Sequence, residues 1–128
     1  MALRVVRLGT ARAPDEGLRI GTVRRPPRGV SKARFAADNW YDVWFPNLAP
    51  SIETMKLGQG AATDAQWATF RRKYRAEMVE PAAAHSIALL AALSHSANLS
   101  VGCYCENEAR CHRSLLREML ADAGAKLA

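Results

Sequence analysis

The sequence predicts a small α/β domain in which helices flank a sheet that is at least partly parallel. A helical pattern over about residues 82–96, a strand-like run over 99–104 and a second helical pattern over about 110–123 follow one another directly. Such alternation is typical of layered folds with parallel strands. The 128 residues, about half of them hydrophobic, suffice for one core but not for two. We therefore expect a single domain over residues 1–128.

Two short strands are expected near the N-terminus. Residues 3–8 form a β-prone run, and residues 18–23 alternate apolar Leu18 and Ile20 with other residue types. The Pro, Asp and Gly of residues 13–17 favour a turn between these strands. The pattern thus predicts two strands joined by a loop, with no helix between them.

A basic loop is expected over residues 24–32. Its two prolines and one glycine exclude regular structure, and four of its nine residues are cations, among them Arg25, Arg28 and Lys32. The loop is either a solvated connector or a clamp for an anion, because guanidinium groups bind phosphate or carboxylate through two parallel hydrogen bonds. Ser31 is expected to cap a short helical turn that follows.

Aromatic residues gather just after this loop. Residues 39–50 hold four of the nine aromatic side chains, and the segment 43–45 has an extended pattern that ends at a proline. Aromatic side chains beside a basic loop can stack on nucleic-acid bases. The alternative is that Trp40, Tyr41 and Trp44 cover an edge of the hydrophobic core.

Three helices are expected before the strand at 99–104. Ser51 is suited to cap a short first helix, which the two glycines of residues 58–60 end. Thr63 or Asp64 is suited to cap a second helix, and Pro81 fits the first turn of a third, largely buried helix. The second helix carries one apolar stripe, made of Trp67, Phe70, Tyr74 and Met78.

Charge and cysteine content narrow the functional classes. The net charge is +6, and residues 1–50 hold nine Lys or Arg against four Asp or Glu. This excess favours an anionic partner, either a small molecule or a nucleic acid. Three clustered cysteines do not suit a secreted disulfide framework, and no apolar run reaches the roughly 20 residues of a membrane span. We expect a cytoplasmic protein with no membrane contact.

Residues 99–113 hold more reactive side chains than any other segment of similar length, because all three cysteines lie there. Cys103 belongs to the predicted strand, and Cys111, His112 and Arg113 belong to the predicted first turn of the last helix. A helix N-terminus and nearby cations favour the thiolate form of a cysteine, and they also favour a bound anion. The sequence therefore predicts a strand–turn–helix site that binds an anion.

Three further interpretations of the cysteines remain open at this stage. A zinc site has the right number of ligands in Cys103, Cys105, Cys111 and His112. Its spacing is unfavourable, since no two cysteines are three apart, and neighbours such as Cys111 and His112 diverge by about 100° on a helix. Cys105 and Cys111 could instead form a redox pair. The cysteines could also be small buried core residues.

The sequence resembles the YeaO-like family, which is known as domain of unknown function 488. The resemblance covers most of the chain from Leu18 to Leu120 and implies a small Rossmann-like layered domain in the cytoplasm. Its motifs are Arg28-Gly29-Val30-Ser31-Lys32, Leu48-Ala49-Pro50-Ser51, Trp67 with Phe70, Tyr74 and Glu77, and Cys103 followed by Cys111-His112-Arg113.

Two departures from the family pattern concern the site. The segment over residues 24–29 lacks the acid and the tryptophan that family members commonly have before the lysine. Many members also have a glutamate two residues after the first cysteine, where this chain has Cys105 with Glu106 beside it. A general acid or base role for that carboxylate is therefore in doubt here.

The leading hypothesis is a pocket for a phosphate-type anionic small molecule, in a protein that acts through a thiol. Cys111 or Cys103 is the candidate reactive thiol, and His112 is the candidate proton-transfer partner. We expect no cofactor and no resident metal in this hypothesis. The alternatives are a non-catalytic nucleic-acid-binding module and a zinc- or redox-linked structural protein. The candidate ligand-binding residues are Arg113, Arg110, Arg28, Arg25, Lys32 and Glu106.

Overall fold

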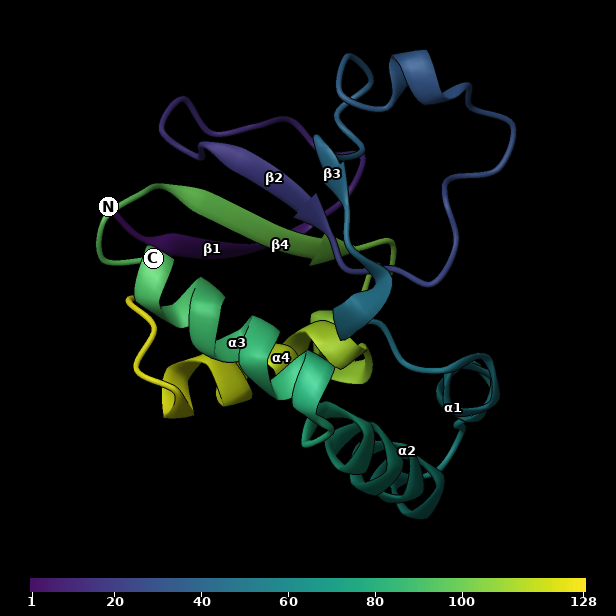
Figure 1. The fold of residues 1–128 in the computed structure, drawn as a ribbon. Coiled ribbons are helices and arrows are strands. Elements are labelled where there is room, and N and C mark those ends of the chain that lie inside the picture. The colour runs from purple at the N-terminus through teal and green to yellow at the C-terminus, as the bar shows by residue number, and fades with distance from the viewer.

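A parallel sheet forms one layer of the structure, and the helices gather on one of its faces (Figure 1). The computed structural model describes residues 1–128. The four strands stand in the order β1-β4-β2-β3, and every pair is parallel. This confirms the α/β prediction. The strands are β1 (Leu3–Arg7), β2 (Leu18–Gly21), β3 (Val43–Trp44) and β4 (Leu99–Cys103).

The four helices begin where the sequence places a capping signal, except the last. Ser51 accepts a hydrogen bond from the Thr54 amide, and Thr63 forms a capping box with Gln66. No single helix is long and apolar enough to cross a membrane, and α2 with α3 meets that test only as a pair bent by 85°. The helices are α1 (Ile52–Gln59), α2 (Asp64–Met78), α3 (Pro81–Leu93) and α4 (His112–Asp122).

The main hydrophobic core lies between the sheet and the helices. The predicted stripe of α2 contributes Phe70, Tyr74 and Met78 to it, while Trp67 packs at its margin. Burial of this apolar surface is the main force that holds the helices on the sheet. The sheet and α4 supply the largest remaining buried side chains, namely Leu3, Ile20, Leu99, Val101, Leu115, Leu116 and Leu120.

The opposite face of the sheet is closed by loops around a buried ion pair. Arg19 is fully buried, and its Nε and Nη2 donate to the Glu16 carboxylate at 2.6 and 2.9 Å. Ser100 on β4 donates to the same carboxylate at 2.7 Å. This arrangement corrects the expected alternation of the second strand, because Leu18 is 48% exposed while Arg19 is buried. A satisfied charge pair can be buried where an isolated charge cannot.

Reactive and charged side chains gather at the carboxyl edge of the sheet. β4 lies between β1 and β2, so the segments that follow all three strands meet at one edge. Each of these strands ends slightly earlier than predicted, at Arg7, Gly21 and Cys103. Residues 8–17 and 22–42 therefore form longer connections than the sequence suggested, and neither contains an α-helix.

Candidate functional site

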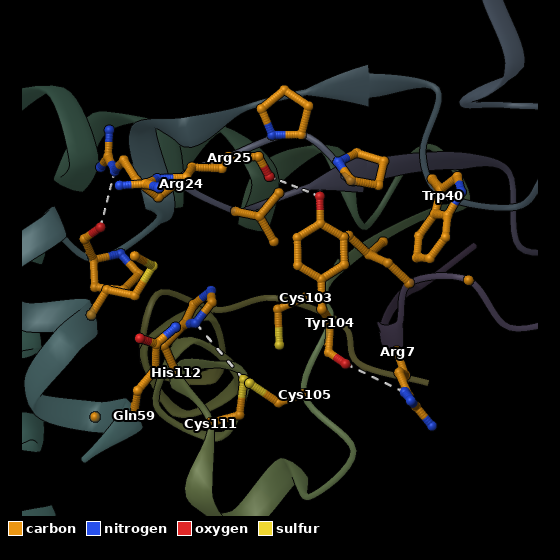
Figure 2. A pocket seen from close by; sticks show the side chains of 18 of the residues that line it. Arg7, Arg24, Arg25, Trp40, Gln59, Cys103, Tyr104, Cys105, Cys111 and His112 are labelled. Carbon is orange, nitrogen blue, oxygen red and sulfur yellow. Dashed lines mark hydrogen bonds between the residues drawn. The ribbon is translucent and has the colours of Figure 1, made fainter. Parts of the chain in front are cut away.

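A cavity of about 920 Å³ opens at this carboxyl edge. We call it the basic cavity (Figure 2). Its walls come from the segments after β1, β2 and β4, from α1, and from the turn before α4. No Asp or Glu lines it. Six cationic side chains do, namely Arg7, Arg24, Arg25, Arg28, Lys56 and Arg110.

The basic loop and the start of the last helix line this same cavity. The Tyr104 hydroxyl donates to the Arg25 carbonyl at 2.8 Å, which ties the loop to the end of β4 (Figure 2). Arg24 donates to the carbonyls of Pro46, Ala49 and Pro50 at 3.0–3.2 Å, and so holds the loop against the segment before α1. Arg25 and Arg28 are exposed and form no ion pair.

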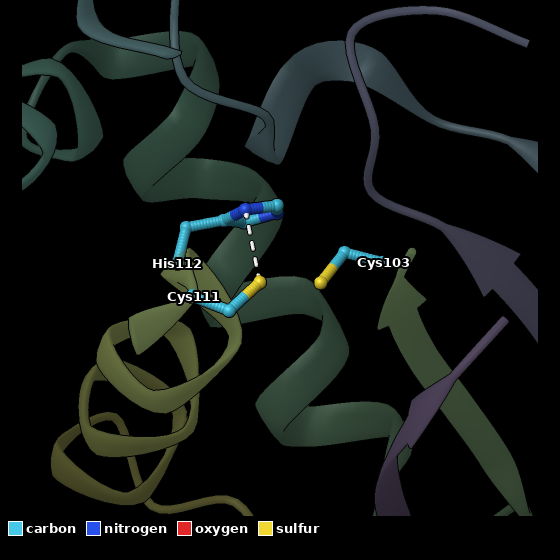
Figure 3. Close-up of side chains that lie close together, drawn as sticks. All are labelled: Cys103, Cys111 and His112. Carbon is cyan, nitrogen blue, oxygen red and sulfur yellow. Dashed lines mark hydrogen bonds between the residues drawn. The ribbon is translucent and has the colours of Figure 1, made fainter. Parts of the chain in front are cut away.

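Three thiols and one imidazole form the floor of the cavity. We call Cys103, Cys105, Cys111 and His112 the Cys–His cluster. One ligand atom from each of Cys103, Cys111 and His112 lies within 4.8 Å of the other two (Figure 3). The Cys111 Sγ lies 3.8 Å from the His112 Nδ1. No two of the cysteines form a disulfide, and Cys105 is the exposed member.

Cys111 stands just before the last helix and not within it. A short 3₁₀ turn, Glu108–Arg110, precedes it, and Cys111 has the extended angles φ −132° and ψ 152° of a helix N-cap. The 100° divergence expected for neighbours on a helix therefore does not apply to Cys111 and His112. Their side chains converge, and Cys103 at the end of β4 faces them (Figure 3).

The orientation of His112 is fixed by its surroundings. Its Nε2 lies 2.8 Å from the Thr22 carbonyl, which can only accept, so Nε2 carries the proton and Nδ1 presents a lone pair to Cys111. The ring packs against Tyr74, with ring centroids 5.5 Å apart. Burial lowers the pKa of His112, so the imidazole is neutral at pH 7.

The three thiols ionise as a coupled set. Burial raises the pKa of the Cys103 thiol, and its contacts with the other two thiols raise it further. The neighbouring Cys103 and Cys111 thiols lower the pKa of the Cys105 thiol. For Cys111, contact with Cys103 lowers the pKa, but contact with Cys105 and burial outweigh this and raise it to about 11. Of the three thiols, exposed Cys105 is therefore the one whose thiolate form is most favoured.

Three predicted ligand-binding residues lie outside the lining of the cavity. Arg113 is buried, and its Nη2 donates to the Cys105 carbonyl at 2.6 Å, so it supports the turn that carries the thiols. Glu106 is exposed and pairs with Arg7 at 3.5 Å. Lys32 is exposed in the 3₁₀ turn Lys32–Arg34. Anion-binding roles for these residues stay predictions.

Arg110 lines the cavity and is also engaged elsewhere. Its Nη2 pairs with Asp64 at 2.6 Å, and its guanidinium lies 5.7 Å from the centre of the Trp67 ring. Because Asp64 is almost fully exposed, this pair is weak and can exchange for a ligand. Arg110 can thus turn toward the cavity without loss of a buried contact.

The aromatic segment divides between the core and the cavity. Tyr41 is buried and cannot stack on a base, whereas Trp40 lines the basic cavity beside Tyr104. Trp44 is 43% exposed, and its indole donates to the Val23 carbonyl. The three side chains therefore form no common stacking surface.

The candidate ligand-binding residues omit three of the six lining cations, and one thiol was underrated. Arg24 is omitted although it lies in the loop that the sequence singles out. Arg7 is the last residue of β1, and its position at a strand's carboxyl end is a signal that could have placed it. Lys56 carries no such signal, because only the packing of α1 brings it to the cavity. Cys105 enters the sequence interpretation only as a possible zinc ligand or redox partner, although it is the exposed thiol.

Comparison with known proteins places the chain in one family. A family model described as "Active DUF488-N3 subclade" matches residues 3–124, which is nearly the whole chain. No curated protein and no solved structure matches the chain. The match gives a family and names no reaction.

Proposed function

The chain belongs to the DUF488 family, and on that premise we propose that it binds a phosphate-type anionic small molecule in the basic cavity and acts on it at the Cys–His cluster. The observation that carries the proposal is the composition of the lining, with six cations and no carboxylate. A partly enclosed site of one charge sign attracts ligands of the opposite sign and concentrates them.

The cations of the cavity differ in how free they are to bind. Arg25 and Arg28 pair with no carboxylate. Arg24 donates to backbone carbonyls, which are uncharged, so its positive charge is not neutralised. Paired guanidinium groups match the oxygen geometry of a phosphate. We therefore propose that Arg25 and Arg28 bind the anion and that Arg24 contributes a fixed positive charge.

The size of the cavity indicates a ligand larger than an inorganic ion. A volume of about 920 Å³ is at the upper end of the range for small-molecule sites. Apolar side chains such as Val23, Trp40, Met55 and Phe70 share the lining with the arginines. A ligand with an organic part and a phosphate group suits both kinds of surface.

The chemical part of the proposal is supported by the Cys111–His112 pair. The Nδ1 of His112 is held toward the Cys111 Sγ at 3.8 Å by the contact of Nε2 with Thr22. A thiol beside an imidazole lone pair is an arrangement that enzymes use for nucleophilic attack. The family description calls the subclade active, which agrees with a protein that retains its reactive residues.

Calorimetric titration with phenyl phosphate tests the binding step. We expect saturable binding, which the double variant Arg25→Gln/Arg28→Gln weakens at least about tenfold, because hydrogen bonds to charged groups contribute about 1.5–3 kcal/mol each. The matched control, Arg71→Gln/Arg72→Gln, removes two exposed arginines of α2 and should bind like the wild type. Equal weakening by both double variants, or no saturable binding, would contradict the proposal.

Protection from alkylation tests whether the ligand reaches the thiols. In chelator-treated protein, iodoacetamide should modify exposed Cys105 first. Bound phenyl phosphate should slow that modification, because the Cys–His cluster forms the floor of the cavity that the ligand fills. An unchanged rate at saturating phenyl phosphate would place the ligand away from the cluster.

A further inference from the structure

We propose that the Cys–His cluster is a binding site for a zinc-type divalent cation, with Cys103, Cys105, Cys111 and His112 as its four ligands. The inference goes beyond the proposed function and shares its place, since the ion would lie at the floor of the same basic cavity. With the ion bound, Cys111 and His112 are ligands, so nucleophilic attack by Cys111 belongs to the metal-free protein. Metal content and anion affinity are separate measurements, so either proposal can fail alone.

The distances between the ligand atoms suit a tetrahedral ion. Zinc lies about 2.3 Å from a thiolate sulfur and about 2.0–2.1 Å from an imidazole nitrogen, so neighbouring ligand atoms in a tetrahedron are roughly 3.5–3.8 Å apart. The Cys111 Sγ and the His112 Nδ1 are 3.8 Å apart, and all three pairs among Cys103, Cys111 and His112 lie within 4.8 Å. Figure 3 shows these three side chains turned toward one another, so a small inward movement is enough to bring their ligand atoms to tetrahedral distances.

The backbone already presents these three ligands to one point. Cys103 closes β4, the central strand of the β1-β4-β2 trio, and Cys111 occupies an extended N-cap position. Both residues are buried, with 1% and 2% of their surface exposed. Little conformational entropy is therefore lost when an ion binds, because the side chains are held in place before it arrives.

The hydrogen bond behind His112 is the one that metal-binding histidines usually have. Histidine ligands commonly donate their second ring nitrogen to a carboxylate or a backbone carbonyl, which fixes the tautomer and the ring plane. Here Nε2 donates to the Thr22 carbonyl at 2.8 Å, and Tyr74 packs against the ring. The Nδ1 lone pair is thereby directed at the centre of the cluster.

Cys105 supplies the fourth ligand from the exposed side. Its sulfur is not among the three ligand atoms that lie within 4.8 Å of one another, so its side chain must turn toward them when the ion binds. Its backbone carbonyl is anchored by the Arg113 Nη2 at 2.6 Å, which holds the turn close to the other ligands. Since Cys105 is exposed, an ion can enter from the cavity and be closed in by this residue.

The charge of the loaded site is balanced by Arg113. Three thiolates and one neutral imidazole around a divalent ion carry a net charge of −1. Arg113 is 4% exposed, donates from its Nη2 to the Cys105 carbonyl at 2.6 Å, and has an Nε with no hydrogen-bond partner. A buried guanidinium with an unsatisfied N–H needs a negative neighbour, and the loaded cluster provides one.

The chemistry of the site selects a soft cation and involves no oxidation. On binding, each thiol that is still protonated releases its proton to solvent, each of the three sulfurs forms a bond to the metal, and His112 donates its Nδ1 lone pair. Three sulfur ligands and one nitrogen favour zinc and exclude magnesium or calcium, which require oxygen ligands.

Metal analysis of the purified protein tests the site. The reduced protein is stripped with a chelator, incubated with one equivalent of Zn²⁺, desalted and measured by mass spectrometry of the elements. We expect close to one zinc per chain. A parallel sample with Co²⁺ should show the intense visible and sulfur charge-transfer absorption of a tetrahedral thiolate site. Retention below about a tenth of an equivalent, or a weak octahedral spectrum, would overturn the proposal.

Two variants assign the ligands without relying on the buried cysteines. Cys105→Ser changes an exposed residue and should lower Zn²⁺ affinity at least about tenfold while the far-UV spectrum stays unchanged. His112→Gln should also weaken binding, whereas the control His85→Gln, on an exposed face of α3, should not. Unchanged affinity in Cys105→Ser, or equal loss in His85→Gln, would contradict the four-ligand assignment. Loss of zinc with intact phenyl phosphate binding would leave the anion proposal standing.

Discussion

At Gly102 the central strand passes its neighbour so closely that no side chain fits. A Cβ placed there would lie 2.6 Å from the Val6 carbonyl oxygen of β1 and 2.9 Å from a methyl group of Leu8. The close approach brings the segment after β1 against the end of β4, next to Cys103. The neighbour that excludes a side chain at Gly102 is thus the backbone of β1.

Gly102→Ala tests this constraint at the scale of one residue. We expect a loss of roughly 1–3 kcal/mol in the free energy of unfolding, because the two strands must move apart to admit the methyl group. Urea denaturation measures the loss. Gly60→Ala is the matched control, since a Cβ at Gly60 meets nothing closer than 3.4 Å and should change stability little. Equal stability of Gly102→Ala and the wild type would show that the strands are not tightly apposed.

At the scale of elements, the face of the sheet without helices depends on the Glu16–Arg19–Ser100 network. Hydrogen bonds with Arg19 and Ser100 outweigh the effect of burial and lower the pKa of Glu16 from 4.5 to about 2. A depressed folded-state pKa stabilises the protein above the unfolded-state pKa, and this contribution is lost as the pH falls through the folded value. Acid should therefore weaken this face between about pH 4.5 and pH 2.

Glu16→Gln tests the role of the network. We expect a loss of roughly 3–5 kcal/mol in stability at pH 7, because Arg19 keeps its buried charge without a partner. The variant should also lose less stability than the wild type between pH 4.5 and pH 2. Chemical denaturation over that pH range measures both effects. Parallel pH profiles for the two proteins would show that Glu16 is not the titrating group.

Local sequence signals predicted most elements but not how the long connections fold. Capping residues and apolar periodicity located α1, α2 and α3, and β-prone runs located three of the four strands within a few residues. The pattern at Arg19 failed because burial of this residue depends on Glu16 and Ser100, and Ser100 is distant in sequence. Packing between remote segments leaves no mark in local periodicity.

The candidate site was only partly predictable, because it also depends on packing between segments that are remote in sequence. Cys103, Cys111, His112, Arg25 and Arg28 stand out by residue type and by their place at strand ends and helix starts, and the structure brings them to one cavity. Arg113 was expected to face a ligand, yet it is buried beneath Cys105. The sequence pattern starts the last helix at about residue 110, whereas Glu108–Arg110 forms a 3₁₀ turn and α4 starts at His112. Residues 106–110 give no local signal for this turn.

At the scale of the whole molecule, positive charge and reactive side chains meet at one place. Most of the net charge of +6 comes from residues 1–50, and the loop over 24–28 brings it to the Cys–His cluster. Exposed charges are screened over about 10 Å at 0.1 M salt, so the affinity for an anion should fall as ionic strength rises. The fold thus joins a basic wall from the N-terminal half to a thiol floor from the C-terminal half.

Chemical-shift mapping by NMR during a titration with inorganic phosphate tests the central claim most directly. The account predicts saturable amide shifts in three segments, residues 7–10, 23–28 and 103–112, which line the basic cavity. Shifts spread over exposed cations of α2, such as Arg71 and Arg72, with no saturation in those three segments, would contradict it.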